Sequence, residues 1–306
     1  MTRPRPLRSG DRIAIVAPAS GCPREELDRG ATEISRLGYE PVFTEAIFER
    51  GWFSAGPASV RAADFMRAWS DPSIGALIAL RGGYGSVHLL PLLSRDEVLR
   101  SPKLFIGYSD TTSLLSWLTC QCGMAALHGP MVERRLSLGS DGYDERSLLA
   151  LLQGGQGLEL TPDGVTVLHE SDAAGPLFGG TLTNIVASLA TPYAFDPPAG
   201  CVLFIEDVNE RPYRLDRMLT QLRLSGVLGR ARALVFGEMR GCDEPGGGIA
   251  ARDVVDAAMR EFPGPVLYGF PSGHTLGPCW TLPLGVNVRV VTGPRPGLIV
   301  EEPPVA

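Results

Sequence analysis

Ser109 is a residue whose type and position could support nucleophilic chemistry. It lies in K-L-F-I-G-Y-S-D-T-T-S-L-L, residues 103–115, where an apolar strand pattern ends near Gly107 and a helix pattern begins. A serine on a sharp strand-to-helix bend has its hydroxyl pushed out of the sheet, and the unpaired N–H groups of the helix start can bind an oxyanion. The stretch lacks the second glycine of G-x-S-x-G. Taken alone, it favours a helix cap made by Ser109 or Asp110.

A glycine-rich turn, R-G-G-Y-G at residues 81–85, follows another strand pattern at 74–80. Consecutive glycines let the backbone approach a ligand closely and donate N–H groups to an anion or oxyanion. The turn has neither the G-K-[ST] ending of a P-loop nor the spacing G-x-G-x-x-G. A plain tight turn is an equally good interpretation. Arg81 beside it is a candidate for holding a substrate carboxylate.

Carboxylates follow a strand in the second half of the chain. The apolar run C-V-L-F-I at 201–205 leads directly into Glu206 and Asp207. A carboxylate at that edge of a sheet could orient an imidazole, or it could form an ion pair with Arg211 or Arg214. The sequence does not distinguish Glu206 from Asp207 or Glu210 in this role.

Histidine is the usual general base for serine near neutral pH, and the chain has four. His274 lies in Y-G-F-P-S-G-H-T, a loop bounded by glycine and proline after an apolar strand, which favours an accessible side chain. His128, in A-L-H-G-P-M, is the competitor, and a structural hydrogen-bonding role suits it at least as well. A serine, a carboxylate and a histidine that each follow a strand predict a triad in the order Ser, Glu, His.

Strand and helix patterns alternate in the first half, which must position Ser109. Such alternation predicts a parallel sheet covered by helices, with ligands at the carboxyl ends of its strands. The predicted strands are 12–18, 39–44, 74–80 and 103–108, and the predicted helices are 25–38, 60–70, 86–93 and 110–122.

The pattern changes after about residue 150. We predict an N-terminal α/β domain at 1–150, an interdomain crossing at 151–175 and a smaller, β-rich α/β domain at 176–306. In the last part, helices are expected at 181–190 and 213–226, and strands at 201–205, 232–237, 265–268, 281–284 and 286–291.

The composition limits the classes of partner. The formal charge of −6 argues against a nucleic-acid partner, which needs clustered Lys and Arg. No apolar run is long enough for a membrane span or a signal peptide, so a cytoplasmic protein is expected. The six cysteines are scattered, and Cys120 and Cys122 lack zinc-like spacing to any second pair. We therefore expect neither a metal nor a cofactor.

Motifs along nearly the whole chain resemble one family, the LD-carboxypeptidases of murein-peptide recycling, together with their microcin self-immunity relatives. The first half contributes L-R-S-G-D-R-I-A-I-V-A-P-A-S, R-A-A-D-F-M-R-A-W-S-D-P-S-I-G-A-L-I-A-L-R-G-G-Y-G, G-Y-S-D-T-T and H-G-P-M. The second half contributes F-G-G-T-L-T-N-I-V-A-S-L-A-T-P, I-E-D-V-N-E-R-P-Y-R-L-D-R-M-L-T-Q-L and G-F-P-S-G-H-T. Several long motifs in one order make the resemblance specific, and the cap interpretation of Ser109 becomes the lesser one.

The resemblance implies Ser109 as nucleophile, Glu206 as orienting acid and His274 as general base, with an oxyanion hole from the N–H groups of Gly83 and Asp110. It also implies a glutamine-amidotransferase-like N-terminal domain, a swivelling-type β-rich C-terminal domain, and a homodimer. The reaction implied is cytoplasmic removal of the terminal D-Ala from a murein tetrapeptide, at the bond after the L-centre of diaminopimelate or Lys. The candidate substrate-binding residues are Arg81, Gly82, Tyr84, Thr181, Asn184 and Arg211.

The chain departs from the family pattern at some positions. Thr181 stands where the family usually has Asn, and His88 where we expect Arg. One alternative function is a microcin-immunity-type peptidase that cleaves peptidyl or aminoacyl nucleotide analogues, for which Trp280 and Tyr193 are possible aromatic platforms. A non-catalytic murein-peptide binding protein is a second alternative. The presence of all three triad residues counts against it.

Overall fold

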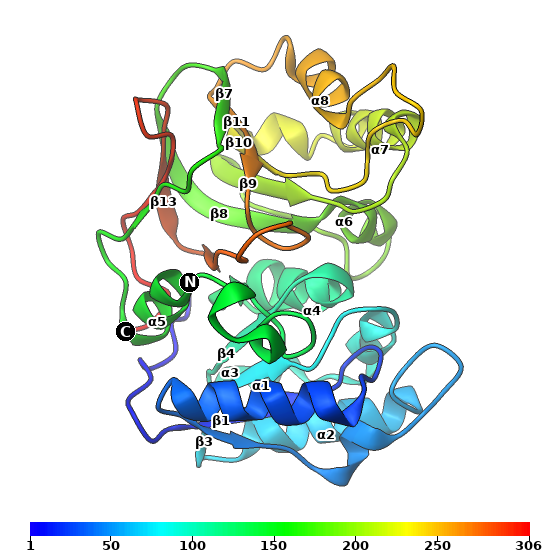
Figure 1. Ribbon diagram of the computed structural model, residues 1–306, viewed down its shortest axis with the longest axis vertical. Coiled ribbons are helices and arrows are strands. Elements are labelled where there is room, and N and C mark those ends of the chain that lie inside the picture. Colours follow the sequence, from blue (N-terminus) through cyan, green and yellow to red (C-terminus); the bar gives the residue numbers. More distant parts are fainter.

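The computed structural model describes residues 1–306 and contains two β-sheets with helices packed around them (Figure 1). The six-stranded sheet lies in the lower half of the view and the eight-stranded sheet in the upper half. The nucleophile candidate Ser109 comes from the first half of the chain, and Glu206 and His274 come from the second.

The six-stranded sheet has the order β12-β5-β4-β3-β1-β2, and all its pairings are parallel except that of β12 with β5. Every residue of β3 is buried, as is typical of a parallel strand covered on both faces. The parallel sheet predicted from the first half is confirmed. Its strands are β1 (Arg12–Val16), β2 (Glu40–Val42), β3 (Ile74–Ala79), β4 (Leu104–Gly107), β5 (Ala126–His128) and β12 (Leu282–Leu284).

Helices connect and cover these strands. In α1, acidic side chains in the first turn and Arg36 in the last complement the helix dipole, and one face is buried. The helices of this half are α1 (Arg24–Arg36), the 3₁₀ helix η1 (Glu45–Phe48), α2 (Ala58–Ser70), the 3₁₀ helix η2 (Ser86–Leu92), α3 (Arg95–Arg100), the 3₁₀ helix η5 (Leu136–Asp141) and α5 (Glu145–Gln153).

The single helix predicted at 110–122 is divided into three consecutive pieces. It begins as the 3₁₀ turn η3 (Ser109–Thr111), continues as α4 (Thr112–Ser116) and ends as the π-helix η4 (Trp117–Gln121). α4 packs against β8 and α6 of the other half of the molecule. The helix that starts at Ser109 therefore lies at the junction of the two sheets.

The eight-stranded sheet has the order β6-β14-β13-β8-β9-β10-β11-β7, and its central strands β8 to β11 are parallel. The strands are β6 (Glu159–Leu160), β7 (Thr166–His169), β8 (Ala173–Thr181), β9 (Cys201–Glu206), β10 (Ala231–Gly237), β11 (Val266–Phe270), β13 (Asn287–Val291) and β14 (Gly297–Val300). The helices are α6 (Leu182–Ser188), α7 (Pro212–Leu224), the 3₁₀ helix η6 (Leu228–Arg230) and α8 (Ala251–Met259).

Two segments differ from the sequence-based boundaries. The predicted crossing at 151–175 contains β6, β7 and the start of β8, which are strands of the second sheet. In addition, β12 comes from the range 176–306 but pairs with β5 of the first sheet. Short edge strands carry little sequence signal, because only partners distant in the chain complete their hydrogen bonds.

The two sheets share a hydrophobic core. The larger cluster of buried side chains extends from the first sheet onto one face of the second, where it includes Val202 and Phe204. The alternate residues of β9, Leu203 and Ile205, point to the opposite face and join a second cluster under α6, α7 and α8. No helix combines the length and apolarity needed to cross a bilayer.

Candidate active site

Ser109 lies on a strained bend directly after β4. Its φ is 64°, in the left-handed region that residues other than glycine seldom adopt. Such strain concentrates at functional sites, where the surrounding structure holds it. The side chain is partly exposed, whereas Gly107, Tyr108 and Asp110 around it are buried. The bend thus presents the Ser109 hydroxyl at the carboxyl end of a parallel strand, as the sequence predicted.

The glycine-rich turn at 81–85 packs against this bend. A Cβ on Gly82 would lie 2.8 Å from Ser109 Cβ and 2.9 Å from its Oγ, so only glycine fits there. Gly83 has φ of 96°, and its N–H makes no hydrogen bond within the protein. The turn therefore brings a free backbone N–H close to the nucleophile candidate, which is what an oxyanion hole requires.

Asp110 holds the turn through its side chain. Its carboxylate accepts hydrogen bonds from the N–H groups of Gly85 at 3.2 Å and Ser86 at 2.8 Å, and its carbonyl accepts one from the Ser86 hydroxyl at 2.6 Å. The sequence suggested Asp110 as a candidate helix cap, and the family resemblance implied a role for its backbone N–H. Its carboxylate also fixes the glycine-rich turn relative to Ser109.

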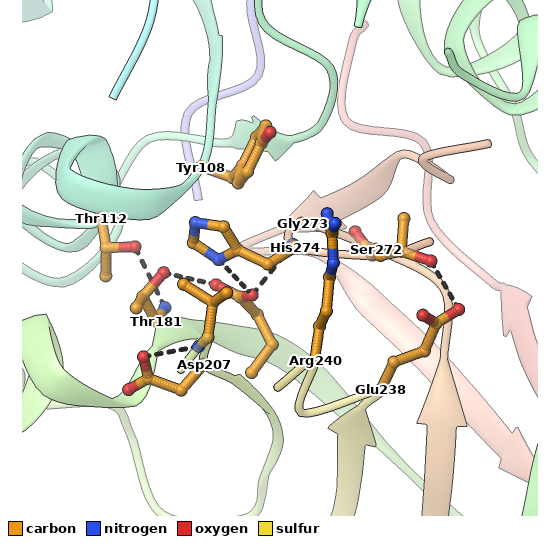
Figure 2. A network of polar contacts seen from close by, with 12 residues as sticks. Tyr108, Thr112, Thr181, Asp207, Glu238, Arg240, Ser272, Gly273 and His274 are labelled. Atoms are coloured by element: carbon orange, nitrogen blue, oxygen red, sulfur yellow. Dashed lines mark hydrogen bonds and ion pairs between the residues drawn. The ribbon is translucent and has the colours of Figure 1, made fainter. Parts of the chain in front are cut away.

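Glu206 and His274 form a direct pair. Glu206 is the last residue of β9, and His274 lies in the loop after β11. The Nδ1–H of His274 donates to Glu206 Oε2 at 2.7 Å, and the backbone N–H of His274 donates to the same oxygen at 3.0 Å. Figure 2 shows the second ring nitrogen directed away from the carboxylate. This arrangement leaves Nε2 available to take a proton.

The contact between Glu206 and His274 shifts both pKa values in the direction that favours the charged form of each side chain. Burial alone raises the pKa of Glu206, but the charge and hydrogen bond of His274 and the Thr181 hydroxyl outweigh it, so the pKa is held well below its usual range. Burial likewise lowers the pKa of His274, yet the Glu206 charge and hydrogen bond outweigh it and raise that pKa above its ordinary value of 6.5.

Thr181 anchors the other oxygen of the carboxylate. It is the last residue of β8, and the strand register pairs it with Glu206. Its hydroxyl donates to Glu206 Oε1, and its backbone N–H donates to Thr112 Oγ1 at 3.1 Å (Figure 2). Sequence reasoning placed Thr181 among the substrate-binding candidates. In the structure, its hydroxyl donates to Glu206 instead.

Tyr108, the residue before Ser109, contacts His274. The Tyr108 ring meets the His274 ring edge to face, with centroids 5.1 Å apart (Figure 2). Ser109 Oγ donates no hydrogen bond to His274 in this structure. Catalytic hydrogen bonds are often long before substrate binds and tighten in the complex.

The structure separates the alternatives that the sequence left open. Asp207 accepts hydrogen bonds from Thr183 at 2.8 and 2.7 Å, and Glu210 is ion-paired with Arg214 at 3.5 Å. Only Glu206 of the three carboxylates contacts His274.

His128, the competing base, is fully buried and bonds through Nδ1 to Ser272 Oγ at 2.9 Å. Burial lowers the pKa of His128 to about 4.

The basic residues proposed to grip substrate are already paired. Arg81 contacts Glu133 at 3.1 Å and donates to the Gly21 carbonyl, and Arg211 contacts Glu244 at 2.9 Å. Neither guanidinium is free to meet a substrate carboxylate without giving up its present partner.

A cavity of about 320 Å³ adjoins the site at the junction of the two halves. The first half contributes Gly83, Tyr84 and Asp110 to its wall, and the second contributes Asn184 and Tyr193. Asn184 also donates to the Asp110 carbonyl at 3.4 Å. Three predicted residues, Gly83, Tyr84 and Asn184, therefore share one cavity beside Ser109.

Glu238 is a site residue that the sequence analysis missed. It follows β10, and its carboxylate accepts a hydrogen bond from the Thr275 hydroxyl (Figure 2). It also accepts one from the N–H of Leu276 at 2.9 Å. The signal that singled out Glu206, a carboxylate directly after a buried strand, applies equally to Glu238. It fixes the loop that carries His274.

Comparison with known proteins identifies the family of the chain. The family models described as the LD-carboxypeptidase N-terminal and C-terminal domains match residues 13–129 and 174–290. A Streptomyces coelicolor protein is 33% identical over 95% of this chain and 93% of its own length.

Two solved structures are similar along almost the whole chain. Muramoyltetrapeptide carboxypeptidase from Oxalobacter formigenes has a TM-score of 0.80 at 28% identity, covering 95% of this chain and 99% of its own. The microcin C7 self-immunity protein MccF has a TM-score of 0.90 at 23% identity, covering 99% of both chains, and shows the same mixed α/β fold. The chain belongs to the LD-carboxypeptidase family of serine peptidases.

Proposed function

We propose that the protein is a serine carboxypeptidase that uses Ser109, His274 and Glu206 in an acyl-enzyme mechanism. The observation that carries the proposal is the pairing of His274 with Glu206 beside a serine held at positive φ. A binding protein needs neither the strained serine nor the oriented imidazole.

In the proposed reaction, His274 Nε2 takes the hydroxyl proton as Ser109 attacks the scissile carbonyl carbon. The N–H groups of Gly83 and Asp110 hold the oxyanion. Collapse of the tetrahedral intermediate breaks the peptide bond, and His274 gives its proton to the leaving amine. Water then attacks the acyl-enzyme, with His274 again as base, and regenerates Ser109. Glu206 keeps the imidazole in the Nδ1–H tautomer and stabilises its charged form.

The proposed substrate is a murein tetrapeptide, from which the enzyme removes the terminal D-Ala during cell-wall recycling. The similarity to a muramoyltetrapeptide carboxypeptidase supports this choice. We assign the cavity lined by Tyr84 and Asn184 to substrate binding. Arg81 and Arg211 would have to exchange Glu133 and Glu244 for substrate carboxylates.

A microcin-immunity-type activity on aminoacyl nucleotide analogues is the second candidate. The MccF-like fold supports it, and so does Tyr193, whose side chain borders the cavity and could stack on a base. Trp280, the other proposed platform, packs against Phe270 instead.

We infer a glutamine-amidotransferase-like domain at 1–150 and a swivelling-type domain at 176–306, apart from β12. We also infer a cytoplasmic homodimer, in keeping with the family resemblance.

Turnover of L-Ala-γ-D-Glu-diaminopimelate-D-Ala, followed by mass spectrometry, tests the function. Loss of D-Ala by the wild type but not by Ser109→Ala is expected. Binding without release of D-Ala would contradict the enzyme, and equal activity in Ser109→Ala would contradict the nucleophile. An aminoacyl-sulfamoyl adenosine assayed in parallel distinguishes the two candidate activities.

A further inference from the structure

Arg135 is a buried cation that binds backbone carbonyls rather than a carboxylate. Its side chain comes from the segment between β5 and η5, and the residue is 7% exposed. The guanidinium donates to the carbonyls of Gly273 and Thr275, each at 2.9 Å, to that of Gly277 at 3.0 Å and to that of Gly142 at 3.4 Å. Two of these carbonyls belong to the residues on either side of His274.

The same guanidinium also reaches the nucleophile side of the site. Its Nε donates to the Tyr108 hydroxyl at 3.4 Å, and its central carbon lies 5.9 Å from the Tyr108 ring centroid. Tyr108 immediately precedes Ser109, and its ring packs against His274. One side chain of the first half therefore contacts the neighbours of both proposed catalytic groups.

The loop at 271–277 depends on such contacts for its shape. It has no regular secondary structure, and Gly273 has φ of 77°. Glu206 and Glu238 accept the N–H groups of His274 and Leu276, so carboxylates satisfy two donors of the loop. The Arg135 guanidinium satisfies its acceptors.

We propose that Arg135 is a positioning residue that holds the Ser109 bend and the His274 loop in a fixed position relative to each other. The inference rests on the roles proposed for Ser109 and His274. A guanidinium is suited to this task because its planar fork carries five donors in fixed directions. A misplacement of the proposed base by about 1 Å can cost about 100-fold in rate. The contacts of Arg135 with Tyr108 and with the 271–277 loop, called the clamp below, therefore matter for chemistry as well as for folding.

Arg135 also contributes charge to the site. Glu206 and Asp207 raise the pKa of His274, whereas Arg135 lowers it, and the nearby Tyr108 and His128 are neutral near pH 7. Removing the guanidinium should therefore raise the pKa of His274 further and move the acid limb of the pH–rate profile to higher pH.

The test compares Arg135→Met, Arg135→Lys and a matched control, Lys103→Met. Lys103 is also a buried cation that binds carbonyls, those of Asp71 and Ile74 at 3.0 and 2.7 Å, but it lies at the opposite end of β4 from Ser109. For each variant, kcat, KM, the acid limb, the melting temperature and hydrogen exchange of the peptide 271–279 are measured.

For Arg135→Met we expect kcat to fall about 100-fold with KM nearly unchanged, the acid limb to move up and exchange in 271–279 to accelerate. Arg135→Lys should recover part of the lost kcat, because it restores the charge and up to three donors. Lys103→Met should lower the melting temperature while kcat and exchange in 271–279 stay at wild-type values.

Wild-type kcat in Arg135→Met, or an equal loss of kcat in Lys103→Met, overturns the inference. So does unchanged exchange in 271–279. Hydrogen exchange reports on the clamp without any turnover, so a failure of the proposed nucleophile, seen as activity in Ser109→Ala, is distinguishable from a failure of the clamp.

Discussion

His128 and His274 are two imidazoles in similar places with opposite properties. His128 is the last residue of β5 and His274 lies in the loop after β11. Each packs against the Tyr108 ring, with centroids 6.0 and 5.1 Å away. A Cβ on Gly273 would lie 2.8 Å from Glu206 Cδ and 3.0 Å from His128 Cε1, so His128 is also close to the carboxylate. Yet the pKa of His274 is raised and that of His128 is lowered.

The difference lies in the hydrogen-bond partner. The Ser272 hydroxyl donates to the Trp280 carbonyl at 2.8 Å, so it accepts the Nδ1–H of His128. His128 Nε2 is buried without a partner, which leaves nothing to stabilise a second proton. His274 bonds directly to Glu206. A single carboxylate contact thus separates a proposed base from a histidine that stays neutral.

The largest expected effect is that of replacing the paired histidine. His274→Ala should lower kcat about 10⁴- to 10⁶-fold, because the proposed base is lost. His128→Asn, which keeps a donor for Ser272, should lower kcat less than about tenfold. Steady-state release of D-Ala measures both. The reverse order of effects would make His128 the base and contradict the comparison.

Removing the charge of Glu206 should have the next largest effect. Glu206→Gln should lower kcat about 10³- to 10⁴-fold, because the amide cannot favour the Nδ1–H tautomer or the imidazolium. Asp207→Asn is the matched control, since that carboxylate bonds Thr183 rather than His274. Similar losses in both variants would mean that general charge, rather than the direct contact, matters.

The pH–rate profile of these variants sharpens the same point. Activity of the wild type should rise with pH through the His274 pKa, which lies above 6.5, because only the neutral imidazole accepts a proton. Glu206→Gln should move this limb to lower pH, since the charge that raises the pKa is gone. An unmoved limb would indicate that another group titrates.

The lowered pKa of His128 should make the free energy of unfolding depend on pH. Its folded pKa of about 4 lies below the unfolded value of about 6.5, so the unfolded chain binds the proton first. This stabilising contribution is complete above about pH 6.5, and it falls by roughly 3 kcal/mol as pH drops to 4. Urea unfolding should give His128→Asn a shallower fall in stability than the wild type over that range. Parallel curves would contradict the neutral state of His128.

The smallest effect is expected at Thr181. Thr181→Val removes the hydroxyl that donates to Glu206 and should cost about 2 kcal/mol in stability and less than about tenfold in kcat. Thr181→Ser keeps the hydroxyl and should retain most of both. Thermal unfolding and kcat are measured together. A wild-type melting temperature in Thr181→Val would mean that the anchor contributes nothing.

Much of the fold follows from local pattern. The strands β1, β3, β4, β9 and β10 were all predictable, because each is a continuous apolar run bounded by turn residues. The edge strand β6 was not, since its pairing depends on a partner more than a hundred residues away in the chain. β12 was predicted as a strand at 281–284, but its pairing with β5 was not. The composition of the chain likewise gives no sign that β12 belongs to the first sheet.

The site divides in the same way. Ser109, Glu206 and His274 became candidates because residue type and position after a strand are properties of the sequence. Only the family resemblance favoured Glu206 over Asp207 and Glu210, and a nucleophile over a helix cap at Ser109. The sequence alone determined that the chain carries a serine, a carboxylate and a histidine at strand ends, together with the family motifs around them.

Only the tertiary structure showed that Glu206 contacts His274, that Thr181 donates to Glu206, and that Arg135 binds the loop that carries His274. These choices depend on distances between segments that the fold brings together. A carboxylate one residue away along a strand points to the opposite face, so Glu206 and Asp207 differ in surroundings although they are neighbours in sequence.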